Sequence, residues 1–166
     1  MNEKRYEKIS SWFRKSEKRL KAFKTIYVIQ PYIVILGYLF CIIIAFLKKD
    51  MESVARIVLV PVITFLACTV FRKFLNKSRP YERMEIHPLI IKNKKGQSFP
   101  SRHTVSAVII AMSALYTNVV FGVVMLFIAM IVGALRIMAG VHYVKDVVAG
   151  ILMGVLFGVM GFYIIL

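Results

Sequence analysis

Long apolar runs dominate this sequence and restrict it to a membrane fold. A helix needs about 20 apolar residues to cross the roughly 30 Å hydrocarbon layer of a bilayer. Runs of at least this length cover residues 25–47, 53–75, 101–139 and 147–166. A hydrophobic content of 59% agrees with a chain that faces lipid and excludes an ordinary soluble domain.

The third run is too long for a single crossing. Residues 116–118 supply a polar turn near its middle, so we interpret the run as a helical hairpin. The sequence therefore predicts an all-α, polytopic membrane bundle of about five transmembrane helices, formed by residues 25–166 as one domain. Cys41 and Cys68 fall within the predicted spans, where we expect packing and no disulfide.

Residues 1–24 are strongly basic and contain no continuous apolar stretch, which excludes a signal peptide. Apolar side chains recur among the charges at roughly helical spacing: Tyr6, Ile9, Trp12, Phe13, Leu20 and Phe23. This pattern predicts an amphipathic helix lying on an anionic membrane surface; the alternative is a frayed basic tail. The net charge of +15 flanks apolar runs, so we expect membrane lipids as partners and no nucleic acid.

The basic residues also predict an orientation. The N-terminal segment should stay in the cytoplasm under the positive-inside rule. With five spans, the connections at 72–100 and 136–146 would lie on that same side, and Lys92, Lys94 and Lys95 support this. We therefore expect a multi-pass protein of the cell membrane whose polar loops face the cytoplasm.

Three clusters of charged and polar residues lie at the ends of the apolar runs. The first is Arg72 with Arg79, which on a continuous helix would share one face at the end of the second span. Pro80 should stop that helix. Two guanidinium groups presented together can form bidentate hydrogen bonds to phosphate oxygens, although arginines at such positions also reach lipid headgroups.

The second cluster opens the third apolar run with Pro100, Ser101, Arg102 and His103. Ser101 is a favourable N-cap, so the first amides of the following helix and its dipole would favour a bound anion. His103 would lie in the first turn, placed to meet the leaving group of a bound phosphate. A lone histidine at a helix start is more often a surface residue, so its neighbours decide the interpretation.

The third cluster contains Arg136, His142 and Asp146. The i, i+4 spacing puts His142 and Asp146 on one helical face, where the carboxylate can accept the Nδ1 proton and leave Nε2 as a nucleophile. We expect Ala139 and Gly140 to break the chain and return Arg136 to the same phosphate. The alternative is a structural histidine–aspartate pair, but ionisable groups near a bilayer are costly and usually functional.

The order R-x6-R-P, P-S-R-H and R-x5-H-x3-D resembles the type-2 phosphatidic acid phosphatase superfamily, which includes lipid phosphate phosphatases and vanadium haloperoxidases. The family pattern is K-x6-R-P, P-S-G-H and S-R-x5-H-x3-D, and the match covers residues 72–146. The resemblance implies that His142 is a nucleophile oriented by Asp146 and that His103 protonates the leaving oxygen. It assigns phosphate binding to four residues: Arg72, Arg79, Ser101 and Arg136. It implies neither a metal nor a cofactor.

The sequence departs from this pattern at three positions. Arg72 replaces the lysine and keeps the charge, whereas Leu135 replaces the serine before Arg136 and removes a hydroxyl. Arg102 replaces the glycine, and we count it among the candidate phosphate ligands because it could bind a second phosphate or a headgroup. The first helix of the family's usual six-helix core is missing, and the basic segment stands in its place.

We therefore expect an integral-membrane, metal-independent lipid phosphatase that hydrolyses a phosphomonoester or diphosphate lipid through a phosphohistidine. Phosphatidylglycerophosphate, phosphatidate and undecaprenyl diphosphate all fit as substrates, and a cytoplasmic site favours the first two. Two alternatives remain open: a lipid phosphotransferase that uses the same histidine, and a non-enzymatic scaffold that binds anionic lipid through its basic helix. The sequence predicts no particular oligomeric state.

Overall fold

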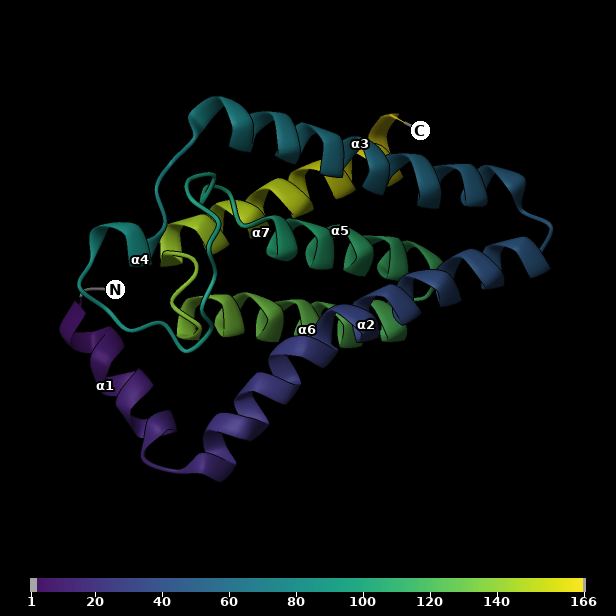
Figure 1. Cartoon of the computed structure of the whole chain (residues 1–166). Helices are drawn as coiled ribbons and strands as arrows, with labels where there is room; N and C mark the ends of the chain where they lie inside the picture. The colour runs from purple at the N-terminus through teal and green to yellow at the C-terminus, as the bar shows by residue number, and fades with distance from the viewer. Residues whose placement is uncertain (1–2, 166) are drawn as a thin grey trace.

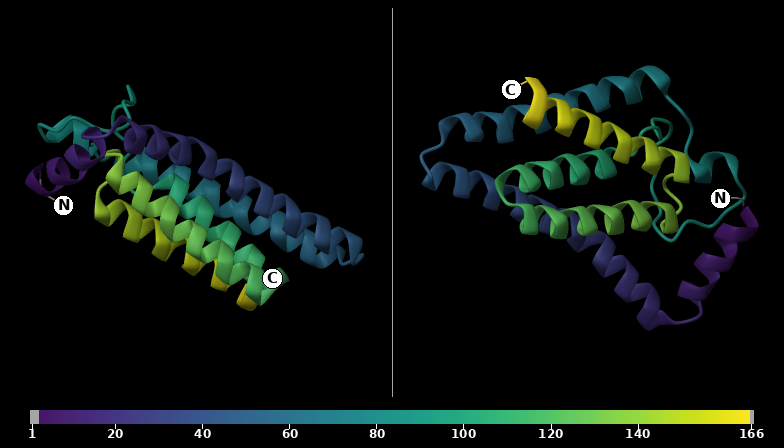
Figure 2. Two further views of the ribbon diagram at one scale, coloured as in Figure 1. Left: turned by 90° about the horizontal axis from the view of Figure 1, so that it is seen from below. Right: turned by 180° about the vertical axis from the view of Figure 1, so that it is seen from behind.

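The computed structural model describes residues 3–165, which form a helical bundle (Figures 1 and 2). The long helices are α2 (Glu17–Leu47), α3 (Met51–Leu75), α5 (Arg102–Thr117), α6 (Val119–Met138) and α7 (Val144–Val159), which continues into the short π-helix η1 (Met160–Ile165). Two shorter helices, α1 (Glu3–Arg14) and α4 (Pro80–Arg83), lie at one end of the bundle together with the long loop that precedes α5. The predicted all-α class is confirmed.

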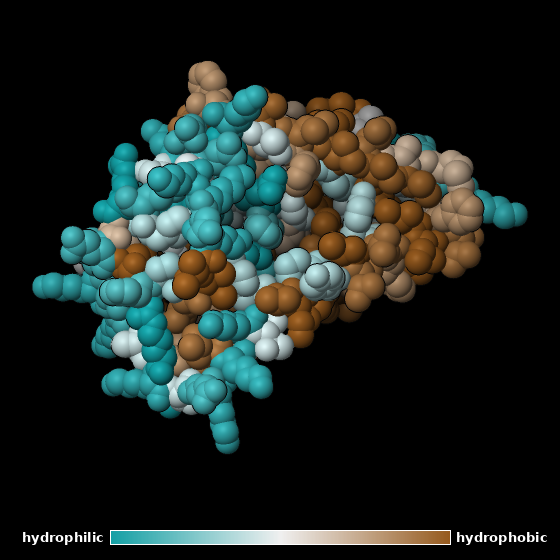
Figure 3. All heavy atoms as spheres, in the orientation of Figure 1, coloured by the Kyte–Doolittle hydropathy of each residue, from teal (hydrophilic) through white to brown (hydrophobic). Residues whose placement is uncertain are grey.

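The outer surface of the bundle is apolar, as expected of a protein that spans a membrane. Within residues 3–165, four segments are long and apolar enough to cross: Glu17–Leu47, Met51–Arg83, Val119–Met138 and Val144–Ile165. Leu36, Phe127 and Leu152 are each more than half exposed on this surface, and soluble proteins rarely expose continuous apolar patches of this extent. Figure 3 shows the apolar surface over the bundle and hydrophilic residues at the end that carries α1 and α4.

The first half of the predicted hairpin, α5, is a short central helix. It has 16 residues, or about 24 Å at 1.5 Å per residue, and it packs against α2, α3, α6 and α7. These four neighbours shield it from lipid. The predicted turn at 116–118 is present, because α5 ends there and the side chain of Asn118 caps α6 by accepting a hydrogen bond from the Phe121 N–H at 2.9 Å.

A stripe of glycines brings α7 into close contact with α5. A Cβ at Gly154 would lie 2.7 Å from the Val108 side chain, and one at Gly150 would lie 3.0 Å from the carbonyl oxygen of Ser101. Only residues without side chains permit this approach. It allows the Ser101 N–H to donate to the carbonyl oxygen of Asp146 at 2.8 Å, which fixes the start of α5 beside the start of α7.

The N-terminal segment folds as two helices. α1 ends at Arg14 and α2 begins at Glu17, so residues 17–24 form the start of a membrane helix. Tyr6 on α1 is fully buried, and its hydroxyl accepts a hydrogen bond from the Leu89 N–H at 3.0 Å. The same hydroxyl lies against Gly140, where an added Cβ would come within 2.6 Å. α1 therefore covers the end of the bundle at which the loop before α5 and the turn between α6 and α7 meet.

Candidate active site

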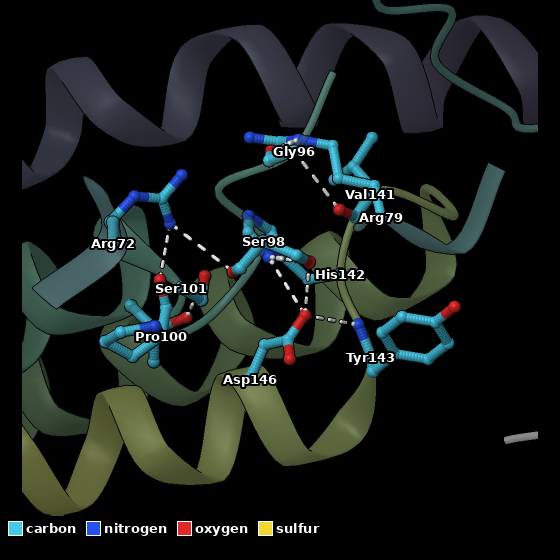
Figure 4. A network of polar contacts seen from close by, with 11 residues as sticks. Arg72, Arg79, Gly96, Ser98, Pro100, Ser101, Val141, His142, Tyr143 and Asp146 are labelled. Atoms are coloured by element: carbon cyan, nitrogen blue, oxygen red, sulfur yellow. Dashed lines mark hydrogen bonds and ion pairs between the residues drawn. The ribbon is translucent and has the colours of Figure 1, made fainter. Parts of the chain in front are cut away.

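Residues of the three clusters lie at the polar end of the bundle, where the starts of α5 and α7 face the ends of α3 and α6 (Figure 1). Figure 4 shows Arg72, Arg79, Ser101, His142 and Asp146 close to one another. His142 lies in the turn before α7, and Asp146 lies in the first turn of that helix. Their side chains are 4% and 1% exposed, and Nδ1 of His142 is 3.4 Å from Oδ2 of Asp146. Because Nδ1 faces the carboxylate, Nε2 is the nitrogen left for a substrate.

Ser98 completes this pair, and the sequence reasoning gave it no role. It is fully buried; its hydroxyl donates to Oδ2 of Asp146 at 2.5 Å and lies 3.4 Å from Nδ1 of His142. The backbone N–H of Tyr143 donates to the same oxygen at 3.0 Å. These donors and the N-terminus of α7 stabilise the carboxylate and fix its orientation. The only feature of the sequence that could have indicated a role for Ser98 is its position two residues before the P-S-R-H motif.

The surroundings of His142 favour the neutral imidazole. Burial lowers its pKa below the ordinary value of about 6.5, because the charged ring loses its hydration. The hydrogen bond and negative charge of Asp146 oppose this shift and raise the pKa, whereas the positive charges of Arg79 and Arg72 lower it. At neutral pH the ring is therefore uncharged, which is the form that can act as a nucleophile.

The prediction that Arg72 and Arg79 share one continuous helix is wrong. α3 ends at Leu75, and Asn76 adopts a left-handed conformation (φ 37°) in which its N–H donates to the Arg72 carbonyl oxygen at 3.1 Å. Such left-handed residues are common helix ends. Pro80 occupies the first turn of α4 and so begins that helix, a position that proline favours.

Both arginine side chains nevertheless converge on the loop before α5. Arg72 and Arg79 are 4% and 5% exposed, and both donate to backbone carbonyl oxygens. Arg72 donates to Ser98 (3.4 Å) and Pro100, and Arg79 donates to Gly96 (3.0 Å) and Val141 (3.4 Å). Neither guanidinium forms an ion pair with a carboxylate among the residues that the structure describes. The site therefore retains buried positive charge that an anion would compensate.

Arg136 also lies at this end of the bundle, in the last turn of α6, and is 1% exposed. Its guanidinium lies over the ring of Tyr27, 4.2 Å from the centroid. Its Nε and Nη2 atoms have no hydrogen-bond partner within the described part of the chain. The predicted chain break is present, because α6 ends at Met138 and Gly140 has φ 76°. Buried N–H groups without acceptors are costly, so this arginine is also suited to a bound anion.

The start of α5 contributes the remaining candidates. Ser101 occupies the N-cap position, but its hydroxyl accepts a hydrogen bond from Thr104 at 3.0 Å and forms no cap bond within the described chain. The first-turn amides lack intrahelical partners and can serve an anion. His103 lines a cavity of about 310 Å³ between α2, α3, α5 and α6. Arg102 lines the same cavity, and its guanidinium lies over the ring of Phe65, 5.4 Å from the centroid.

Together these groups form a site for a strongly anionic ligand beside a neutral imidazole. Three buried arginines and the N-terminus of α5 provide donors that suit phosphate oxygens. His142 offers an oriented ring nitrogen that could act as a nucleophile, and His103 is a second titratable group at this end of the bundle. This combination of nucleophile, acid–base group and fixed donors is what phosphoryl transfer requires.

Comparison with known proteins defines the class of this protein. The sequence pattern of the PAP2 superfamily matches residues 53–166, and the chain belongs to this superfamily. Its fold is similar to the crystal structure of LpxE from Aquifex aeolicus, with a TM-score of 0.74, 23% identity, and coverage of 96% of this chain and 93% of that chain. It is also similar to the first transmembrane PAP2 type phosphatidylglycerolphosphate phosphatase from Bacillus subtilis, with a TM-score of 0.70, 22% identity, and coverage of 95% and 82%. No curated protein sequence matches the chain.

The electrostatics of the site lead to a testable titration behaviour. In micelles, nuclear magnetic resonance of isotope-labelled histidine should show His142 titrating below its ordinary pKa of about 6.5. Asp146→Asn should lower this pKa further, because it removes the negative charge that supports the imidazolium. Arg79→Gln should raise it, because it removes a positive charge. A His142 signal that titrates above the ordinary value, or shifts in the opposite directions, would contradict this description.

Proposed function

We propose that this protein is an integral-membrane lipid phosphatase that hydrolyses a lipid phosphomonoester or diphosphate through a phosphohistidine at His142. The observation that carries the proposal is the buried, uncharged His142, held by Asp146 beside arginines that form no ion pair with a carboxylate within residues 3–165. Membership of the PAP2 superfamily supports it. So does the fold shared with a structure whose description names a phosphatidylglycerolphosphate phosphatase.

In the proposed reaction the phosphate binds among the guanidinium groups of Arg72, Arg79 and Arg136 and the first amides of α5 after Ser101. These donors are fixed before substrate arrives, so they stabilise the charge of the transition state without reorganising. Their positive charge takes the role that metal ions have in other phosphoryl-transfer enzymes. Arg102, which lies at the cavity on the α3 side, is proposed to contact a phosphate or headgroup oxygen from there.

His142 then attacks phosphorus through Nε2, and the bond between phosphorus and the lipid oxygen breaks. His103, which takes up a proton when the phosphate dianion binds beside it, donates that proton to this oxygen, so the lipid leaves as an alcohol or as the shortened phosphate. Asp146 stabilises the positive charge that develops on the His142 ring. In the second step His103 accepts a proton from water as the water attacks phosphorus. Inorganic phosphate is released, and His142 returns to its neutral form.

The first test is phosphate release by purified protein in micelles from phosphatidate, phosphatidylglycerophosphate and undecaprenyl diphosphate. His142→Ala should reduce the rate by at least about 10³-fold, because the nucleophile is lost. His87→Ala is the matched control, since His87 is an exposed histidine in the loop before α5. Turnover that survives in His142→Ala, in a protein with an unchanged thermal midpoint, would refute the mechanism.

We also propose that the site faces the cytoplasm. α1 is basic and packs against the loop before α5 through Tyr6, so the N-terminal segment and the site lie at the same end of the bundle. Under the positive-inside rule this end is cytoplasmic. That placement favours phosphatidate and phosphatidylglycerophosphate as substrates, because both are made on that face.

Cysteine labelling tests this orientation. Asn93 is exposed in the loop near the site, whereas Asn118 is exposed in the turn between α5 and α6 at the opposite end. Asn93→Cys and Asn118→Cys would each be introduced into a background with Cys41→Ala and Cys68→Ala. A membrane-impermeant maleimide added to intact cells should label Asn118→Cys and spare Asn93→Cys. The reverse pattern would place the site on the outer face and favour undecaprenyl diphosphate.

A further inference from the structure

The cavity beside His103 has an apolar wall with one buried amide in it. Most of the residues that line the cavity are aliphatic or aromatic. The polar ones lie in the first turns of α5, except for Gln30 of α2. The wall also includes Ile35 and Phe65, which are 50% and 42% exposed on the outer face of the bundle. The cavity therefore lies between the leaving-group side of the site and the surface that faces lipid.

Gln30 is 4% exposed, and neither Nε2 nor Oε1 of its side chain has a hydrogen-bond partner among residues 3–165. Tyr27 lies one turn earlier on the same face of α2. The Tyr27 ring supports the guanidinium of Arg136. Unpaired polar groups inside a membrane bundle are costly, so their presence beside the phosphate-binding arginine needs a reason.

We propose that Gln30 binds the oxygen carried by the carbon next to the phosphorylated carbon of the substrate. The inference rests on the proposed function. Such an oxygen is present in glycerol phosphates, either as a free hydroxyl or as an acyl ester, and it is absent from polyprenyl phosphates. The amide can donate from Nε2 to either form and can accept from a hydroxyl through Oε1.

This arrangement selects glycerophosphate lipids over polyprenyl phosphates. A glycerophosphate lipid satisfies the amide, whereas a polyprenyl chain in the cavity would bury it without a partner. Sites with a buried hydrogen-bonding group discriminate strongly against analogues that lack the partner. Gln30 lies outside the part of the chain that matches the PAP2 superfamily, residues 53–166. α2 thus adds a selective contact to the chemistry provided by the other helices.

The test is built on one pair of substrates that differ only at this oxygen, lysophosphatidate and its 2-deoxy analogue. Purified protein in micelles would be given lysophosphatidate with its free hydroxyl, phosphatidate with an ester, the 2-deoxy analogue of lysophosphatidate, and farnesyl phosphate. For the wild type, kcat/KM for at least one oxygen-bearing substrate should exceed that for the 2-deoxy analogue by about 10- to 100-fold. A preference for lysophosphatidate would indicate that Gln30 binds a hydroxyl, and a preference for phosphatidate would indicate that it binds an ester. Equal values for all of them would overturn the inference.

Gln30→Met then assigns the preference to this residue. The variant keeps the side-chain volume and removes the amide. The ratio of kcat/KM between the preferred oxygen-bearing substrate and the 2-deoxy analogue should therefore fall to about one, because kcat/KM falls for the oxygen-bearing substrates alone. Its thermal midpoint should rise, because an unpaired buried amide is removed; a structural role would lower it. Gln30→Leu should behave in the same way. Ile33→Met, at a lipid-facing position of α2 that is 43% exposed, is the matched control and should keep the wild-type ratio.

The outcomes separate this inference from the proposed function. A wild-type protein that releases no phosphate from any of the four lipids, nor from phosphatidylglycerophosphate or undecaprenyl diphosphate, would refute the phosphatase proposal itself. An active wild type whose preference survives in Gln30→Met would refute only the role of Gln30. An equal loss on all four substrates in Gln30→Met would also refute it.

Discussion

The contact between α5 and α7 determines how the two histidines proposed to take part in the reaction lie relative to each other. Glycines at 150, 154 and 158 remove the side chains that would separate the two helices. The Ser101 N–H then bonds to the Asp146 carbonyl oxygen at 2.8 Å. This bond sets the helix start that carries His103 against the turn that carries His142. A larger residue at any of these glycines would move the proposed acid and the proposed nucleophile apart.

The second requirement is to keep positive charge in an apolar bundle before a substrate arrives. Burying a charged group is costly unless other groups hold it. Arg72 and Arg79 are held by backbone carbonyl oxygens, and Arg136 is held by the ring of Tyr27. None of these partners is a carboxylate, so the charge is oriented without being neutralised. An anionic phosphate would supply the missing compensation, and the arginines would already have the required geometry.

Much of this could be predicted from the sequence, because the signals are local. The apolar runs gave the membrane helices, and the polar tripeptide at 116–118 gave the turn between α5 and α6. The spacing of His142 and Asp146 gave a pair that the structure also brings together. The prediction of one continuous helix through Arg72 and Arg79 was wrong because of the conformation of a single residue. The left-handed Asn76 ends α3 before Arg79; asparagine is a known residue for such ends, but the prediction placed the end at Pro80.

Other features could not be predicted because they depend on contacts between distant segments. Ser98 meets Asp146 across 48 positions in the chain, and Tyr27 meets Arg136 across two helices. The burial of Gln30 has no local pattern either, since a glutamine in an apolar run can equally face a neighbouring helix, a cavity or water. Contacts of this kind depend on how the helices pack, and short sequence motifs carry no information about that packing.

The most direct measurement of the central claim is to trap the covalent intermediate. Purified protein would be mixed rapidly with lipid carrying a radiolabelled phosphate, quenched in alkaline detergent and digested. The account predicts a label that survives alkali, is lost in acid, maps to the peptide containing His142, and is absent from His142→Ala. A label that maps to a serine, or a full burst of free phosphate with no labelled protein, would contradict it.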